Sequence, residues 1–288
     1  NILCSFTDKN FLCHMKFYFT TKAKIVFVLP FYQGGDLFNL LLKNGKFDET
    51  TTAFYAAQIA NMISFLHSKN IAYRDLKLEN LMINENGYLT LIDFGSCKII
   101  EEQNELESSF VGSPDYIPPE VITGDGHNLM ADWWSFGILI YELLYGFPPF
   151  HDDKIERCFD LITSSNIRFP SKIRLTSTTK DFIVKLLKKN PNERLGKGEF
   201  DQVIAHTFFE SVNIMDRFFI ESNNKYKPDD LHLIGICSIF ISSKFNEIHP
   251  IKLSFLIENI SHNKFNKEQI LKMEENIMFT LKFDILRP

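Results

Sequence analysis

Two short runs of residues, separated by one predicted hairpin, constrain this 288-residue chain most strongly. The run YRDLKLEN covers residues 73–80, and the run DFGS begins at Asp93, thirteen positions after Asn80. Between them, two apolar segments flank the sequence Asn-Glu-Asn-Gly, in which Asn-Gly is a typical signal for a tight turn between antiparallel strands. A hairpin at this position fixes the separation of the two runs. We therefore expect Asn80 and Asp93 to lie close together.

The polar side chains of these runs are the types that phosphoryl transfer requires. Asp75 can accept the proton of a substrate hydroxyl, and Lys77 can neutralise charge on a transferring phosphate. Asn80 and Asp93 offer oxygen ligands of the kind that Mg²⁺ prefers. Either run alone is a weak signal, because such triplets are common. Both together at this spacing predict a site that uses ATP and Mg²⁺.

Residues 1–209 resemble an AGC-type eukaryotic serine/threonine protein kinase. Besides the two runs, the resemblance rests on VGSPDYIPPE at 111–120, DWWSFGILIYELLYGFPPF at 132–150 and NPNERLG at 190–196. It implies that Arg194 pairs with Glu120. It also implies that the Asp132 carboxylate holds the loop of Asp75 through backbone hydrogen bonds, which is a structural role.

The part of the family's small lobe that covers the nucleotide has no counterpart in this sequence. The chain contains no G-x-G-x-x-G loop, no strand bearing the phosphate-pairing lysine and no helix bearing the glutamate that pairs with it. Two strands, expected at 16–20 and 24–29, represent that lobe, and the first residue is Asn rather than Met. We therefore expect an incomplete start and little or no phosphotransfer by residues 1–288.

The resemblance also implies which residues contact the nucleotide and which regulate the site. ATP contacts are expected from Leu29, Phe31, Asp36, Met82 and Lys77. A phosphate on Ser109 would add roughly −1.5 to −2 charge and would pair with Arg74 and Lys98. The alternative is that Ser109 is an unmodified surface serine. Ser113 matches a hydroxyl that orients Asp75 and Lys77 in the family.

Three carboxylates match positions that bind basic residues of peptide substrates in related kinases. These are Asp36, Glu79 and Glu142, and they favour Arg or Lys two and three residues before the phosphorylated Ser or Thr. Ordinary solvated acids are the alternative, and Asp36 also suits the N-cap of a helix expected at 37–42. An apolar pocket for the residue after the target is expected from Phe110, Pro114 and Ile117.

The last quarter of the sequence resembles a different family. Residues 212–288 hold three apolar-periodic helical segments and resemble the cyclin N-terminal box from its second helix onward. The resemblance implies that Lys244 and Glu274 contact a cyclin-dependent kinase, with ordinary surface charge as the alternative. Because the usual first helix has no counterpart, we expect an exposed apolar face at 233–240. A genuine fusion and an accidental joining of two gene fragments are both open.

Composition excludes several other classes of protein. The net charge of −5 argues against nonspecific nucleic-acid binding, and the longest apolar run, 233–241, is too short to span a membrane. Five scattered cysteines without C-x-x-C spacing indicate free thiols in a reducing compartment, the cytoplasm or the nucleus.

The expected fold is mainly α (α+β). It comprises a kinase large lobe with two residual small-lobe strands, followed by a partial all-α cyclin box. The expected function is that of a basophilic ATP-dependent serine/threonine kinase, and the alternative is a non-catalytic, kinase-binding module.

Overall fold

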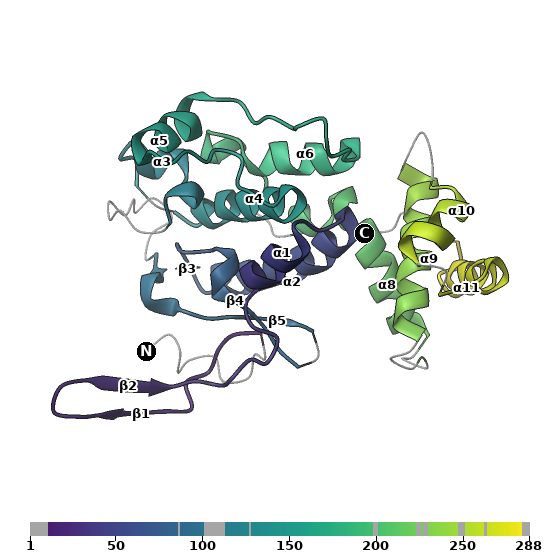
Figure 1. The fold of residues 1–288 in the computed structure, drawn as a ribbon, viewed down its shortest axis with the longest axis horizontal. Helices are drawn as coiled ribbons and strands as arrows, with labels where there is room; N and C mark the ends of the chain where they lie inside the picture. Colours follow the sequence, from purple (N-terminus) through teal and green to yellow (C-terminus); the bar gives the residue numbers. More distant parts are fainter. Residues whose placement is uncertain are drawn as a thin grey trace. The chain divides into compact units, whose positions relative to one another are not determined.

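A computed structural model describes residues 11–85, 87–100, 113–126, 128–197, 201–222, 226, 230–246, 251–261 and 264–283. The chain divides into two compact units, Asn1–Val203 and Ile204–Pro288, each with its own helices (Figure 1). The described part of the first unit combines helices with short strands, whereas that of the second is helical.

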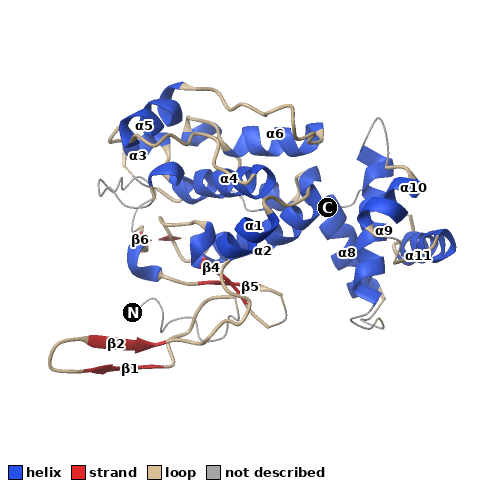
Figure 2. Cartoon of the chain, in the orientation of Figure 1, coloured by secondary structure: helices blue, strands red, loops and turns tan. Residues whose placement is uncertain are grey.

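Three two-stranded antiparallel sheets form the β structure of the described part of the first unit (Figure 2). Strand β1 (Phe17–Thr20) pairs with β2 (Ile25–Val28), and β3 (Ile71–Ala72) pairs with β6 (Lys98–Ile99). The hairpin predicted between the two sequence runs is confirmed as β4 (Leu81–Ile83) and β5 (Leu89–Leu91), with Leu81 opposite Leu91. This register brings the residues just before β4 and just after β5 to the same end of the hairpin.

Helix α4 (Met130–Tyr145) forms the centre of the first unit. Figure 1 shows it between α2 (Glu49–His67) and α6 (Ser177–Leu186), and it packs against both. All its residues from 131 to 145 are buried, which explains why the sequence is apolar on every side of the helix. The remaining helices of this unit are α1 (Leu37–Asn44), α3 (Pro119–Ile122) and α5 (Ile155–Ser164), and α7 (Asp201–Ile204) lies at the boundary.

Side-chain caps determine where the first two helices begin. The Asp36 carboxylate accepts a hydrogen bond from the Asn39 backbone at 2.7 Å, which confirms the N-cap expected for α1. The Asp48 carboxylate accepts one from the Thr51 backbone at 2.6 Å. This cap accounts for the start of α2 at Glu49.

The second unit is a helical bundle with its own apolar core. Its helices are α8 (Glu210–Glu221), α9 (Leu231–Asn246), α10 (Leu253–Phe255), the π-helical turn η8 (Leu256–Ile260) and α11 (Lys267–Thr280). The expectation of an exposed apolar face on α9 is wrong. Helices α8 and α11 both pack against α9, so that Ile234, Cys237 and Phe240 are buried. In the described part of the chain, no helix combines the length and the apolar character needed to cross a membrane.

Candidate active site

A buried carboxylate holds the loop that carries most of the predicted site. Asp132, on α4, is 1% exposed and accepts hydrogen bonds from the backbone N–H groups of Tyr73 and Arg74 at 2.9 and 2.8 Å. His67 Nε2 lies 2.8 Å from the same carboxylate. Arg74 has a φ of 70°, a left-handed conformation that these contacts stabilise. The structural role predicted for Asp132 is therefore confirmed.

Asp75, Lys77, Asn80 and Ser113 form one hydrogen-bonded group beyond that anchor. Lys77 Nζ donates to Asp75 Oδ2 at 2.9 Å and to Ser113 Oγ at 3.3 Å. The Asn80 amide donates to the Asp75 carbonyl oxygen at 2.8 Å and to Asp75 Oδ2 at 3.2 Å. These bonds direct the amide nitrogen of Asn80 toward Asp75, which leaves its carbonyl oxygen as the atom suited to a cation.

Asp93 enters the same region from the other end of the hairpin. The Ile92 N–H donates to the Asn80 carbonyl oxygen at 3.0 Å, so the residue before Asp93 is bonded directly to the backbone of Asn80. Asp93 is exposed, has a φ of 54°, and accepts a hydrogen bond from the Gly95 backbone at 3.1 Å. The close approach of the two chain segments that the hairpin predicted is therefore present.

The aromatic ring of Tyr73 packs beneath this group. Its hydroxyl donates to the Ile92 carbonyl oxygen, and its ring contacts Phe94 edge-on with centroids 5.8 Å apart. Burial raises the pKa of Tyr73 well above its usual value, and the negative charges of Asp75 and Asp93 act in the same direction. The phenol therefore remains neutral and supports both loops.

The donor set fits a magnesium ion that also takes ligands from a substrate. Asn80 and Asp93 supply oxygen atoms alone, which suits a hard cation. Among the residues that the structure describes, no cluster of three or more His, Cys, Asp or Glu side chains is placed to hold a metal. Two protein ligands of this kind therefore require further oxygen ligands, such as phosphate groups and water.

Three of the predicted nucleotide contacts, Leu29, Phe31 and Asp36, lie on the segment that leads from β2 to α1. Leu29 and Phe31 are 44% and 88% exposed. Further along, Asp36 forms an isolated β-bridge with Met82 on β4. Gly34 is also held against this hairpin, because its N–H donates to the Ile83 carbonyl oxygen at 3.1 Å. The structure thus joins Asp36 to Met82 and leaves Leu29 and Phe31 accessible to solvent.

Of the predicted regulatory residues, the structure describes Arg74 and Lys98. Arg74 Nε donates to the Ser96 carbonyl oxygen at 2.6 Å. Lys98 lies on β6 opposite Ala72, two residues before Arg74. The two cations therefore come from adjacent strand ends. Ser109, together with the predicted pocket residue Phe110, lies outside the described residues.

The predicted substrate-binding acids differ in burial. Glu79 is exposed, whereas Glu142 is 6% exposed and accepts a hydrogen bond from the Tyr116 hydroxyl. Burial raises the pKa of Glu142 to about 7, the Tyr116 hydrogen bond opposes this, and the negative charges of Glu79 and Asp115 add to it. Glu79 and Glu142 are therefore electrostatic neighbours.

Asp36, the third acid, caps α1, a helix that packs against the 3₁₀ turn Leu78–Asn80, which carries Glu79. The predicted pocket residues also differ in burial: Pro114 is exposed, whereas Ile117 is buried.

Sequence reasoning missed two residues beside Glu142. Asp115 follows Pro114 within the run VGSPDYIPPE, and His151 follows the run that ends at Phe150. His151 Nδ1 lies 3.1 Å from Asp115 Oδ1. Asp115 could have been found from its place between two predicted residues. His151 gives no local signal, because its role depends on a contact 36 positions away.

A buried ion pair connects two other predicted positions. The Arg194 guanidinium binds the Glu120 carboxylate through two hydrogen bonds of 2.7 and 2.8 Å. The same guanidinium donates to the Met130 carbonyl oxygen at 2.7 Å and lies 5.3 Å from the ring centre of Trp134. The predicted pairing of Arg194 with Glu120 is confirmed, and its full burial makes it a structural element.

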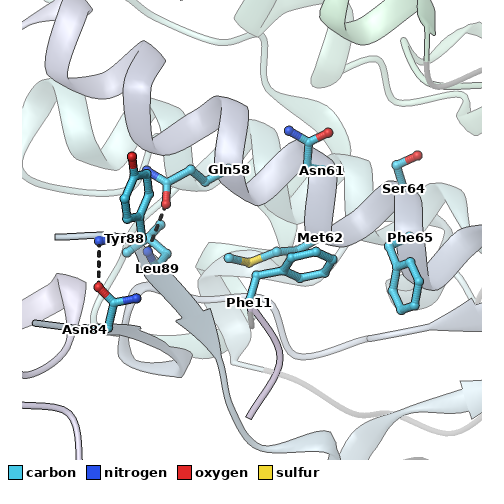
Figure 3. A pocket seen from close by; sticks show the side chains of 9 residues that line it. All are labelled: Phe11, Gln58, Asn61, Met62, Ser64, Phe65, Asn84, Tyr88 and Leu89. Atoms are coloured by element: carbon cyan, nitrogen blue, oxygen red, sulfur yellow. Dashed lines mark hydrogen bonds between the residues drawn. The ribbon is translucent and has the colours of Figure 1, made fainter. Parts of the chain in front are cut away.

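A cavity of about 620 Å³ lies between α2 and the β4–β5 hairpin, apart from these groups (Figure 3). The sticks in Figure 3 show a mixture of aromatic, amide and aliphatic side chains around it. Its lining residues are Phe11, Gln58, Asn61, Met62, Ser64, Phe65, Asn84, Tyr88 and Leu89. None of the predicted site residues is among them.

In the second unit, the two predicted partner-binding residues contact each other. Lys244 Nζ donates to Glu274 Oε1, and it also lies 3.9 Å from the centre of the Phe240 ring. The Lys244 side chain is 40% exposed, so the pair is accessible at the surface. This contact joins α9 to α11.

Comparison with known proteins identifies the family of the chain and a second similarity in its C-terminal part. The protein kinase domain model matches residues 1–209, and the model of the cyclin N-terminal domain matches residues 199–286. The chain therefore belongs to the protein kinase family, and its C-terminal part is similar to cyclins.

The similar proteins are serine/threonine kinases. The chain is 39% identical over 224 residues to RAC-beta serine/threonine-protein kinase A of Xenopus laevis, which covers 77% of this chain and 46% of that protein. It is 40% identical over 206 residues to protein kinase C delta type of Mus musculus, covering 72% and 30%. Serine/threonine-protein kinase gad8 of Schizosaccharomyces pombe is 36% identical over 203 residues, covering 70% and 35%. The AGC-type resemblance is confirmed, and the chain spans less than half the length of these relatives.

Proposed function

We propose that the first unit transfers the γ-phosphate of ATP to serine or threonine hydroxyls of basic protein substrates. The observation that supports this most directly is the hydrogen-bonded group of Asp75, Lys77 and Asn80, with Asp93 on the adjoining segment. A scaffold without catalytic activity has no need for this combination of an acid, a cation and two oxygen ligands.

In the proposed reaction, Asp75 orients the substrate hydroxyl and accepts its proton. Lys77 lies 2.9 Å from Asp75 and offsets negative charge on the phosphate that is transferred. Ser113 Oγ also accepts a hydrogen bond from Lys77, at 3.3 Å, which limits the motion of the ammonium group. Asp132 contributes as a positioning residue, because it holds the backbone that precedes Asp75.

Asn80 and Asp93 are the residues proposed to hold Mg²⁺. When bound, the ion would neutralise phosphate charge and align the phosphates for transfer. The nucleotide is proposed to lie near Leu29, Phe31, Asp36 and Met82, on the segment between β2 and α1 and the strand beside it.

The acids Glu79 and Glu142 are proposed to bind Arg or Lys upstream of the target residue, and Asp36 to contribute a further carboxylate. Their charges suit a basic peptide.

We propose a reducing compartment, the cytoplasm or the nucleus, because the cysteines in the described part of the chain are free thiols.

A radiometric assay of the purified chain tests this function. The substrate is a serine peptide with two upstream arginines, supplied with labelled ATP and Mg²⁺. We expect a low rate that Asp75→Asn reduces by at least about 100-fold, because loss of a general base typically costs 10²–10⁴. Asp153→Asn, at an exposed aspartate of the same unit, is the matched control. Equal rates for the two variants would exclude the proposal.

A second function, binding to a cyclin-dependent kinase, is proposed for the second unit. The match to the cyclin N-terminal domain and the accessible Lys244–Glu274 pair favour it. Titration calorimetry with a purified cyclin-dependent kinase should give binding that Lys244→Ala weakens by about tenfold or more. Lys272→Ala, at an exposed lysine of α11, serves as the control. Absence of binding, or equal affinities for the two variants, contradicts this function.

A further inference from the structure

The Asp115 carboxylate is already occupied by other side chains of the chain. Asp115 lies in the 3₁₀ turn η4 (Pro114–Tyr116), and its Oδ1 atom lies 3.1 Å from His151 Nδ1. The Cys158 thiol, on α5, lies 3.5 Å from the same oxygen. His151 and Cys158, which are close in sequence, thus both lie against one oxygen of a carboxylate 36 and 43 positions earlier in the chain.

This occupied carboxylate lies next to the proposed binding site for basic substrate residues. Tyr116, the residue after Asp115, donates its hydroxyl hydrogen bond to Glu142. The negative charges of Glu79 and Asp115 raise the pKa of Glu142, whereas His151 lowers it. Asp115 and His151 are therefore within electrostatic reach of the acids that are proposed to bind arginine.

The exposure of the pair leaves it open to competition from a ligand. The His151 side chain is 54% exposed and that of Asp115 is 28% exposed. A histidine this exposed contributes little to the fold, since exposed ion pairs add little to protein stability. An incoming guanidinium group can displace the imidazole, because it forms two parallel hydrogen bonds to a carboxylate where the imidazole forms one.

We propose that His151 is a specificity-determining residue, which holds Asp115 and so limits the number of basic substrate residues that the site binds. This inference rests on the proposed function, because it requires that basic peptides bind beside Glu79 and Glu142. With His151 present, a third basic residue adds little to the affinity of the peptide, since it must first displace the imidazole. Without His151, Asp115 becomes an additional acceptor for that residue.

Peptide binding by the full chain tests this without any need for catalysis. Fluorescence anisotropy at pH 7.5 would compare two labelled serine peptides of equal length, one with two upstream arginines and one with a third, more distant arginine. For the unaltered chain we expect similar affinities. For His151→Ala we expect the three-arginine peptide to bind about fivefold more tightly than the two-arginine peptide, the upper range for an exposed ion pair.

Two further variants separate this role from a general change of charge. Asp115→Asn combined with His151→Ala should abolish the fivefold preference, because the additional acceptor is gone. Lys154→Ala removes an exposed cation three residues after His151 and should leave the two affinities similar. If the two-arginine peptide binds but His151→Ala creates no preference, or the preference survives loss of Asp115, the inference is wrong and the proposed function stands. If neither peptide binds any variant, the proposed recognition of basic substrates is wrong, and the inference falls with it.

Discussion

Removal of one partner from the buried Arg194–Glu120 pair should strongly destabilise the first unit. Glu120→Ala leaves the Arg194 guanidinium, which has no exposed side-chain surface, without its two carboxylate hydrogen bonds. The bonds to the Met130 and Lys188 carbonyl oxygens remain, but these groups carry no full charge. An uncompensated buried charge of this kind costs about 3–5 kcal/mol of unfolding free energy.

Urea unfolding followed by tryptophan fluorescence measures this loss in the first unit alone. Both tryptophans of the chain, Trp133 and Trp134, lie on α4, so the second unit does not contribute to the signal. With a slope of about 2 kcal/mol per molar urea, the unfolding midpoint should fall by about 1.5–2.5 M. Such a shift exceeds the error of the measurement.

Two controls decide whether burial is the cause. Asp181→Ala removes the partner of Lys185 in a pair that is about half exposed, and it should cost at most about 0.5 kcal/mol. Glu120→Leu combined with Arg194→Met replaces both charges by apolar groups and should recover much of the stability. A loss below about 1 kcal/mol for Glu120→Ala would refute the reasoning, because the pair would then behave like an exposed one.

Three further predictions concern a buried acid, a glycine turn and the loop anchor. The pKa of Glu142 is raised to about 7, so the folded state binds the proton more tightly than the unfolded state, and stability falls as the pH rises from about 4.5 to 7. In urea titrations, the free energy of unfolding of Glu142→Gln should therefore rise by roughly 2–3 kcal/mol relative to that of the unaltered chain between pH 4.5 and 7. If the unfolding free energies of the two proteins change with pH in the same way, this prediction is wrong. In thermal unfolding, Gly146→Ala should reduce the stability of the protein more than Gly124→Ala does. Both have φ near +83°, where alanine costs about 1 kcal/mol, but only at Gly146 would the added methyl group collide with backbone, that of Gly45. Asp132→Ala should lower peptide phosphorylation by about 100-fold, because the loop that it holds carries the proposed base, whereas an unchanged rate would show that the anchor is dispensable.

The sequence determined the local elements and the residues that could form the candidate site. The spacing of two polar runs around an Asn-Gly turn predicted the β4–β5 hairpin, because strand pairing across a tight turn depends on nearby residues. The mostly apolar run at 132–150 suits the buried helix α4, because burial on every side favours apolar residues.

Only the tertiary structure decided which distant residues meet and which faces are covered. His151 reaches Asp115 across 36 positions, and this contact has no local pattern. The hydrogen bonds from Asp132 to a loop 58 and 59 positions away also lack a local pattern, and they were expected only from the family resemblance. The apolar face of α9 appeared uncovered from the sequence, but α8 and α11 bury it. Hydrophobic periodicity shows that a face must be buried, whereas the element that covers it depends on packing between segments that the pattern does not connect.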